Sequence, residues 1–344
     1  MEVVNYSDKL KRKWDDFVLR HPDGWHYHLV GWREVIRRTY GHECNYISAV
    51  DNDGQIHGLL PSVMIKSRIF GNSLTSLPFI DYAGIIADSK EASESMIKSS
   101  IDFAQSNDLE LVELRQLKQS EGDFLNSTHK VTLVLELPAN EEALFKSLSS
   151  ERRNRVKKAR SSGLSVEIVG PEMLPIFFQI WTENMRDLGS PAHSFDFFKN
   201  ILEIFSDSSA IMLVKYENEF IGGAISLFYK DKLALPWVSS LRKTFHLYPN
   251  NILYWESMLY AISKGFRFFD FGRSTIGSGT YTFKKRWGAE AKQLFWQKIN
   301  LGKKDLTEPD IEKLKYKLLI SLWKKMPISC SRVLGPKIRR FITA

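Results

Sequence analysis

The sequence predicts an α/β protein with mixed sheets, organised as two tandem domains followed by a basic helical tail. Three observations predict this fold class. The chain has 344 residues, which is long for a single domain. The same order of elements, namely hairpin, strand, helix and strand, occurs twice along it. A segment rich in lysine and arginine follows the second copy, from Ile311 onward.

The first half is predicted to open with two helices within residues 1–40. Apolar residues recur at helical spacing from Leu10 to Val18, and the sequence HPDG at 21–24 ends that run. The DNDG turn then predicts a hairpin. The expected elements are strand 46–50, turn 51–54, strand 56–61, an apolar stretch at 73–87, helix 89–107 and strand 109–115.

The second half repeats this order with little sequence identity. Its expected elements are strands 210–215 and 221–229 around a turn at 217–219, an apolar strand around Pro236-Trp237, helix 250–264 and strand 267–271. Each half therefore suits a mixed sheet flanked by helices. The predicted boundaries are an N-terminal domain at 1–137, a C-terminal domain at 138–300 and a basic amphipathic tail at 301–344. A catalytic groove is expected between or beside the two domains.

Composition restricts the class of protein. Hydrophobic residues make up 43% and charged residues 26%, as in ordinary globular proteins. Cys44 and Cys330 are far apart and form no C-x-x-C pair, so neither a disulfide scaffold nor a zinc site is predicted. The histidines at 21, 26, 28 and 42 match no zinc pattern and are predicted to be structural or surface residues. No metal is expected.

The lack of a recognisable signal peptide or membrane span predicts a cytoplasmic protein, and the charge distribution restricts its partners. The first residues lack an apolar signal core, and no run approaches the roughly 18 apolar residues of a membrane span. Nine basic residues and one acidic residue lie from Ile311 to Ala344, and nine minus one accounts for the whole net charge of +8. The rest of the chain is neutral overall, which disfavours a general nucleic-acid coat protein. The segment 311–344 could lie on anionic lipid or pack against a domain.

The stretch from Gly265 to Glu290 has the strongest functional signal. An aromatic run around Asp270 predicts a buried strand, and a loop rich in glycine and hydroxyls follows it. A short basic helix is predicted at 281–287. A strand, a glycine-rich turn and a helix N-terminus place backbone N–H groups and cations together, which suits phosphate, carboxylate or a developing oxyanion. A core strand with an ordinary solvated helix is the alternative.

The sequence FDFGRST-x-GSGTY-x-FKK-x-WGAE in this stretch resembles the corresponding block of the FemAB-like acyltransferases, and most closely those associated with exosortase and exopolysaccharide systems. The similarity covers roughly the first 300 residues. It implies two tandem GNAT-like domains. The related Fem peptidyltransferases move an amino acid from aminoacyl-tRNA onto a peptidoglycan precursor.

The resemblance also implies roles for individual residues. In the Fem family an F-K pair in the last helix meets the aminoacyl end, which makes Phe283 a binding candidate and Lys284 a catalytic candidate here. An aspartate-tyrosine pair beside the acceptor corresponds to Asp81, a catalytic candidate, and Tyr82, a binding candidate. Arg186 matches an arginine implicated in holding the acceptor's phosphates. A structural hydrogen bond remains the alternative for Asp81, and a surface ion pair the alternative for Arg186.

Further binding candidates are the cations of the basic segments and one aromatic residue. Arg153 and Lys157 are like charges at i,i+4 in a run with six cations in ten residues, which fits contact with phosphates or a solvated helix face equally well. The remaining candidates are Arg273, Lys285 and Trp237.

The predicted function is transfer of an amino acid or acyl group onto an amine or hydroxyl of a cell-envelope glycan or peptidoglycan precursor. The expected partners are an activated donor, aminoacyl-tRNA, and a nucleotide- or lipid-linked glycan acceptor, with no resident cofactor. Acyl-CoA ranks second as the donor, because the turn at 239–249 lacks the glycines that cradle a pyrophosphate. The alternatives are an acyl-CoA-dependent GNAT-type N-acyltransferase and a non-catalytic module that binds glycan precursors. A cytoplasmic protein, peripheral at the inner face of the plasma membrane through 311–344, is expected.

Overall fold

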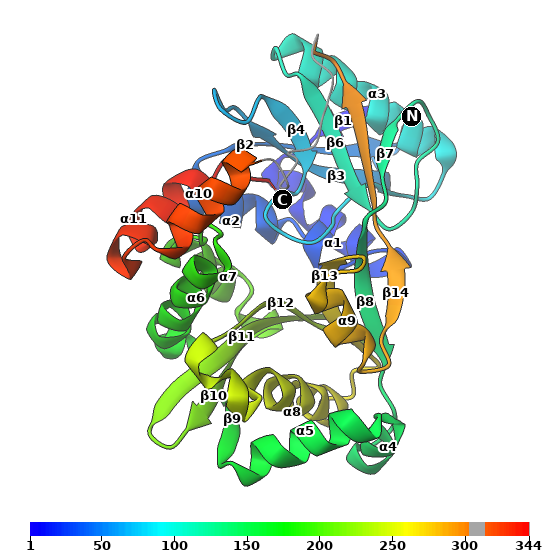
Figure 1. Ribbon diagram of the computed structural model, residues 1–344. Coiled ribbons are helices and arrows are strands. Elements are labelled where there is room, and N and C mark those ends of the chain that lie inside the picture. The colour runs from blue at the N-terminus through cyan, green and yellow to red at the C-terminus, as the bar shows by residue number, and fades with distance from the viewer. Residues whose placement is uncertain (303–313, 344) are drawn as a thin grey trace. The chain divides into compact units, whose positions relative to one another are not determined.

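The computed structural model describes residues 1–302 and 314–343, with the backbone alone at 314–316 (Figure 1). These residues pack into two compact units. Of the described residues, 1–130, 293–302 and 340–343 form unit 1, and 131–292 and 314–339 form unit 2. The part of the predicted tail at 303–313 lies outside the described residues.

Unit 1 is a mixed sheet with helices packed against it. The strands of the sheet are, in spatial order, β1 (Glu2–Asn5), β2 (Glu43–Val50), β3 (Ile56–Ile65), β4 (Ser73–Ser76), β6 (Leu111–Gln116), β15 (Phe295–Asn300) and β7 (Leu125–Ser127), with β5 (Ile86–Ala87) beside β3. The helices are α1 (Lys11–Arg20), α2 (Gly31–Tyr40) and α3 (Lys90–Ser106). The predicted helices and hairpin of this half are confirmed.

Helix α3 closes one face of this sheet. The Ser89 side chain caps it by accepting a hydrogen bond from the Ala92 N–H group at 3.1 Å. Its Ala92 and Met96 pack on β2, β3 and β6 in one apolar cluster. A Cβ atom at Gly58 would lie 2.7 Å from the Met96 methyl group, so glycine there lets α3 approach β3 without a shift of the Met96 side chain.

Unit 2 is built from a second mixed sheet with the strand order β14 (Glu290–Gln293), β8 (Lys130–Glu136), β13 (Phe268–Thr275), β12 (Lys232–Ser240), β11 (Glu219–Tyr229), β10 (Ser209–Tyr216) and β9 (Leu164–Val169). Its helices are α4 (Glu141–Ser147), α5 (Ser150–Ser161), α6 (Leu174–Leu188), α7 (Phe195–Ile204), α8 (Pro249–Ser263), α9 (Gly279–Lys285), α10 (Leu314–Lys324) and α11 (Ile328–Arg339).

Helices cover both faces of the unit 2 sheet. Gly222 faces Val214, which belongs to the apolar core beneath α8 and α5. The next residue, Gly223, faces Phe177 of α6. Since neighbouring residues of a strand point to opposite faces, α8 and α6 lie on opposite sides of the sheet (Figure 1).

The two units repeat one pattern of strand pairing. In unit 1, β2, β3 and β4 pair antiparallel in turn, and β4 pairs parallel with β6 across helix α3. In unit 2, β10, β11 and β12 pair antiparallel in turn, and β12 pairs parallel with β13 across helix α8. The repeated order predicted from the sequence is confirmed, and with it the fold of two tandem units.

Two regions differ in detail from the expected elements. The apolar stretch at 73–87 is extended only at its ends, as β4 and β5. Its middle contains Leu77 and Phe79 with positive φ angles of 28° and 77°. The basic helix expected at 281–287 is α9, which begins two residues earlier, because Ser278 caps it by accepting from the Tyr281 N–H group.

The predicted domain boundaries stay predictions, and the packed units divide the described residues differently. The chain passes from unit 1 to unit 2 after residue 130 and returns near residue 293, so that β15 pairs with β6 of the first sheet. Helices α10 and α11 pack on α6 within unit 2, and residues 340–343 return to unit 1.

No helix among residues 1–302 and 314–343 is long and apolar enough to cross a membrane. In the same residues, no group of three or more His, Cys, Asp or Glu side chains could hold a metal ion.

Candidate active site

The end of strand β13 is the centre of the candidate site in unit 2. In the described chain, β12 and β13 pair in register from Lys232–Phe268 to Ala234–Asp270, and both strands continue beyond that point. Side chains then stabilise the β13 backbone. The Asp270 carboxylate accepts from the Gly272 N–H group at 2.8 Å and from the Thr132 hydroxyl at 2.6 Å. The buried aspartate thus fixes the strand where it turns into the loop.

Lys284 secures helix α9 against this strand end. Its side chain is 9% exposed, and its Nζ atom donates to the carbonyl oxygens of Gly272 and Arg273, each at 3.0 Å. Two carbonyl dipoles therefore hold a buried ammonium group in one place. Lys284, the predicted catalytic residue, has a fixed position beside the end of β13. The same bonds give it a structural role.

Arg152 is a buried cation beside α9 that sequence reasoning passed over. Its side chain is 1% exposed, and its guanidinium lies 4.7 Å from the centre of the Phe283 ring and 5.0 Å from that of Trp287. Its Nη1 atom donates to the Asn251 side chain of α8. Within the described residues, its Nε and Nη2 atoms are buried without a hydrogen-bond partner. Burial, with the nearby cations Arg155 and Arg286, lowers the pKa of Arg152 to about 10.

Helical periodicity could have identified Arg152. It shares one face of α5 with Val156 and Ala159, at i, i+4 and i+7, and all three are buried. The predicted residue Arg153 instead donates through Nη1 to the Leu148 carbonyl at 2.5 Å, at the C-terminal end of α4. Lys157 is exposed, with its Nζ atom 5.5 Å from the centre of the Phe145 ring.

The other predicted residues near β13 and α9 occupy different environments. Phe283 packs against Tyr254 and Trp287, with ring centres 5.5 and 6.3 Å apart. Arg273 lies half-buried on β13, and Lys285 is exposed on α9. Arg273, Phe283, Lys284 and Lys285 lie on one strand–loop–helix segment, in which the Lys284 ammonium contacts the Arg273 carbonyl.

Arg186 and Trp237 lie around helix α6 and its neighbours. Arg186 makes an ion pair with Asp187 at 2.7 Å and donates through Nη1 to the Met326 carbonyl at 3.2 Å. Trp237 is buried, and its ring centre lies 5.5 and 5.6 Å from those of Phe197 and Phe198. These contacts give both residues packing roles in unit 2, and their substrate-binding roles stay predictions.

Asp81 and Tyr82 belong to unit 1, in the irregular segment between β4 and β5. Both are buried, and Tyr82 meets the Tyr27 ring edge-on at 5.5 Å. Tyr82 also lines a small cavity of about 30 Å³ together with His28. The catalytic role of Asp81 and the binding role of Tyr82 stay predictions.

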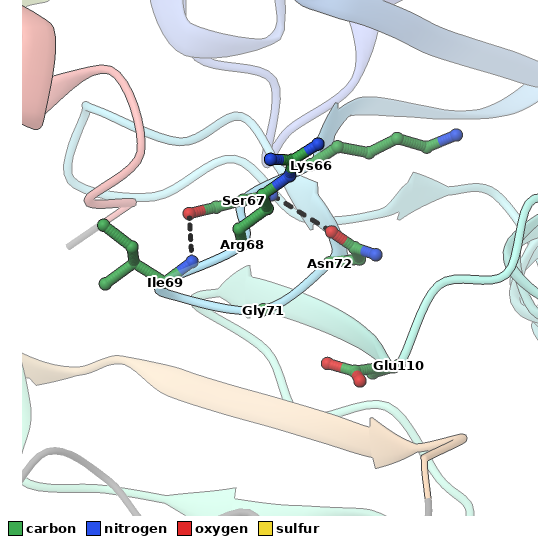
Figure 2. A pocket seen from close by; sticks show the side chains of 7 residues that line it. All are labelled: Lys66, Ser67, Arg68, Ile69, Gly71, Asn72 and Glu110. Carbon is green, nitrogen blue, oxygen red and sulfur yellow. Dashed lines mark hydrogen bonds between the residues drawn. The ribbon is translucent and has the colours of Figure 1, made fainter.

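A larger hollow of about 610 Å³ lies at the turn between β3 and β4 of unit 1. Figure 2 shows the residues that line it, which are Lys66, Ser67, Arg68, Ile69, Gly71, Asn72 and Glu110. The Asn72 side chain accepts from the Ser67 N–H group at 3.0 Å and shapes the turn. None of the predicted site residues is among those that line this hollow.

Comparison with known proteins identifies part of the chain and its fold. Residues 147–285 match the family model described as "Acetyltransferase (GNAT) domain". No curated protein matches the chain.

Solved structures share the fold at low sequence identity. The crystal structure of FemX is 17% identical with a TM-score of 0.66, covering 86% of this chain and 97% of that one. A tandem GNAT protein from the clavulanic acid biosynthesis pathway is 8% identical with a TM-score of 0.56, covering 88% and 99%. The C-terminal domain of an Agrobacterium fabrum protein, provisionally named a lysylphosphatidylglycerol synthetase, is 10% identical with a TM-score of 0.56, covering 85% and 92%.

The matched residues include the end of β13 and all of α9 with Lys284. They also include the buried Arg152 of α5. The similarity to FemX and to the tandem GNAT protein extends over 86% and 88% of this chain. Residues 147–285 therefore match a GNAT-type acetyltransferase domain, which supports an acyltransferase, and the chain as a whole shares the fold of FemX and of the tandem GNAT protein.

Proposed function

We propose that this acyltransferase moves an amino acid or acyl group onto an amine or hydroxyl of a cell-envelope glycan or peptidoglycan precursor. The observation that carries the proposal is the buried ammonium of Lys284, held by the Gly272 and Arg273 carbonyls at the end of β13. The FemAB-like block at 269–290 implies this acceptor class. The fold shared with FemX supports it.

The proposed reaction is a direct transfer without a covalent enzyme intermediate. The acceptor nitrogen or oxygen attacks the carbonyl carbon of the donor ester or thioester, and the new C–N or C–O bond replaces the bond to the leaving group. The proton lost by the acceptor goes to the departing oxygen or sulfur. Negative charge develops on the donor carbonyl oxygen, and a cation already fixed in place stabilises it without reorganisation. Lys284 is assigned this role.

Aminoacyl-tRNA is the proposed donor, and no resident cofactor is assigned. Acyl-CoA is the second candidate, favoured by the match of 147–285 to an acetyltransferase domain. Against it, N–H groups of the turn between β12 and α8 already donate within the turn. The Thr244 N–H group donates to the Leu241 carbonyl at 3.0 Å, and the Tyr248 N–H group donates to the Phe245 carbonyl at 3.1 Å. These two amides are therefore not available to bind a pyrophosphate.

Binding of the purified protein to acetyl-CoA and to a charged aminoacyl-tRNA, at two salt concentrations, tests the choice of donor. Salt-sensitive binding of the tRNA without CoA binding is expected. Specific binding of acetyl-CoA would instead make the protein an acyl-CoA-dependent N-acyltransferase. Binding of a glycan precursor without turnover of either donor would indicate a non-catalytic module.

Substitution of Lys284 tests the proposed mechanism. We expect Lys284→Met to lower kcat by about 10²- to 10³-fold with little change in donor affinity, because one oxyanion-stabilising cation is lost. Lys284→Arg should retain part of the activity. The exposed Lys264, on the same unit, provides the control Lys264→Met, which should keep full kcat.

Because Lys284 also bonds two carbonyl groups, the free energy of unfolding must be measured for the same variants. Lys284→Met should lower it by about 1–3 kcal/mol, the cost of buried acceptors that lose a donor. A Lys284→Met protein that remains folded and turns over at the normal rate would exclude the catalytic role.

A further inference from the structure

Helices α10 and α11 belong to unit 2, and each packs one face against α6 or the segment after it. A Cβ atom at Gly189, which ends α6 with a φ of 82°, would lie 2.5 Å from the Ile320 side chain of α10. A Cβ atom at Gly335 of α11 would lie 3.1 Å from the Ala192 backbone. Small residues thus let both helices approach α6 and the segment after it closely (Figure 1).

The opposite face of α10 is apolar and exposed. Leu318, Leu319 and Leu322 are 58%, 60% and 57% exposed. At 100° per residue these three leucines share one side of the helix, and Ile320 points toward α6 from the other. Side chains of this size are usually buried, so three on one helix face form an unusual patch.

Helix α11 continues this pattern. Val333 and Leu334 are 60% and 42% exposed, whereas Ser331 and Gly335 on the packed side are buried. We call the five exposed apolar residues of α10 and α11 the tail face; its members are Leu318, Leu319, Leu322, Val333 and Leu334.

The charged residues of helices α10 and α11 are all basic. The sequence from 314 to 343 contains no aspartate or glutamate. Exposed cations accompany the apolar residues on both helices, and they are Lys317, Lys324, Lys325, Arg332 and Lys337. The pair of helices therefore combines exposed leucine and valine with lysine and arginine, the composition of helices that lie in a membrane interface.

We propose that the tail face binds the surface of an anionic lipid bilayer, with its apolar side chains inserted at the level of the headgroups. Helices of 11 and 12 residues are too short to cross a bilayer but long enough to lie on one. Anionic headgroups complement the cations. A second copy of the chain would bring a face of the same positive charge against this one, which disfavours self-association here.

This inference goes beyond the proposed transferase activity and does not rest on it, because its readout is binding and not turnover. The test is flotation of the full-length protein with vesicles of phosphatidylcholine alone and of phosphatidylcholine mixed with phosphatidylglycerol. We expect binding to the vesicles that contain phosphatidylglycerol, weakened at high salt, and little binding to the neutral ones.

Two variants separate the apolar and the charged contributions. The triple change Leu318→Ser, Leu319→Ser and Leu322→Ser should lower the vesicle partition coefficient by about tenfold or more, because buried apolar area drives insertion. The charge reversal Lys317→Glu with Lys337→Glu should lower it to a similar degree and weaken its salt dependence, because the cations Lys324, Lys325 and Arg332 remain. A matched control changes exposed apolar residues elsewhere, with Leu19→Ser, Leu125→Ser and Ile168→Ser, and should bind as the unmodified protein does.

Equal binding to neutral and anionic vesicles would overturn the proposal, as would full binding by the triple serine variant. Analytical ultracentrifugation without lipid gives a further test. A dimer that the triple serine variant abolishes would assign the face to a second copy and exclude the lipid surface.

Discussion

The buried guanidinium of Arg152 raises the question of whether its charge or its volume stabilises unit 2. It packs between Phe283, Trp287 and Asn251, and its lowered pKa reflects the cost of burying the charge. Replacing a buried charge by an apolar residue of similar size is often neutral, whereas leaving a cavity is costly. We therefore expect Arg152→Met to change the free energy of unfolding by less than about 1 kcal/mol, and Arg152→Ala to lower it by about 2–5 kcal/mol.

Urea denaturation of the two Arg152 variants measures both values. The exposed neighbour Lys157 offers the control Lys157→Met, which should be close to neutral. If Arg152→Met destabilised the protein as much as Arg152→Ala, the interaction of the charge with the two rings would be the dominant contribution, and packing would not.

For individual residues of the candidate site, the sequence identifies some and misses others, and the difference has a physical reason. The motif around Lys284 identifies the block, and the structure fixes the Lys284 ammonium on the Gly272 and Arg273 carbonyls there. Composition alone does not show which cations of the basic segment in α5 are buried and which are exposed. Only the helical register, which buries Arg152 and exposes Lys157, distinguishes them. The roles of Asp81 and Tyr82 came from the resemblance alone.

Among the elements of unit 1, strand β6 joins a distant segment to the sheet through Arg115. This buried arginine makes an ion pair with Glu113 at 2.8 Å, donates to the Thr343 hydroxyl at 2.9 Å and stacks on Trp296 of β15 at 4.1 Å. The Thr343 carbonyl also accepts from the Phe79 N–H group at 3.3 Å. Residues 340–343 are thereby fixed next to the irregular segment that carries Asp81 and Tyr82.

We expect Arg115→Met to lower the free energy of unfolding by about 3–5 kcal/mol, because it leaves the Glu113 carboxylate buried without the arginine. The double variant Arg115→Met with Glu113→Gln should recover a large part of this loss, since no buried charge remains. A double-mutant cycle by urea denaturation measures the difference. Additive losses from the two single variants would show that the ion pair contributes nothing specific.

The order of elements was predicted well because local signals determine it. Turn chemistry, caps and periodicity lie within a few residues of each element, and the hairpins β2–β3 and β10–β11 and the helices α3 and α8 formed where they were expected. The pairing of β15 with β6 and the return of residues 340–343 to unit 1 join segments far apart in the sequence. Single-sequence patterns contain no signal for such contacts.

For the molecule as a whole, acid sensitivity follows from histidines that are buried in both units. Burial lowers the pKa of His26 to about 3 and that of His28 to about 4, and it lowers the pKa of His193 in unit 2 as well. His26 Nδ1 accepts a hydrogen bond from Trp32 Nε1 at 3.2 Å, and His28 Nδ1 accepts one from the Trp25 backbone N–H group at 3.3 Å. Both rings are therefore neutral in the folded protein. This agrees with the structural role predicted for these histidines.

The direction of the pH effect follows from proton binding. Below about pH 6.5 the unfolded chain protonates these histidines while the folded chain does not, so acid favours the unfolded state. Their contribution is fully present above pH 6.5. It falls as the pH drops toward 4 for His28 and toward 3 for His26. Each histidine can account for a loss on the order of 3 kcal/mol over that range.

We expect the free energy of unfolding, measured by urea denaturation from pH 7.5 downward, to decrease steadily below pH 6.5. His28→Asn preserves an acceptor for the Trp25 N–H group but binds no proton, so its stability should depend less steeply on pH between 6.5 and 4. The exposed His246 provides the control His246→Asn, which should keep the slope of the unmodified protein. An unchanged slope in His28→Asn would mean that carboxylates, and not the buried histidines, determine the acid sensitivity.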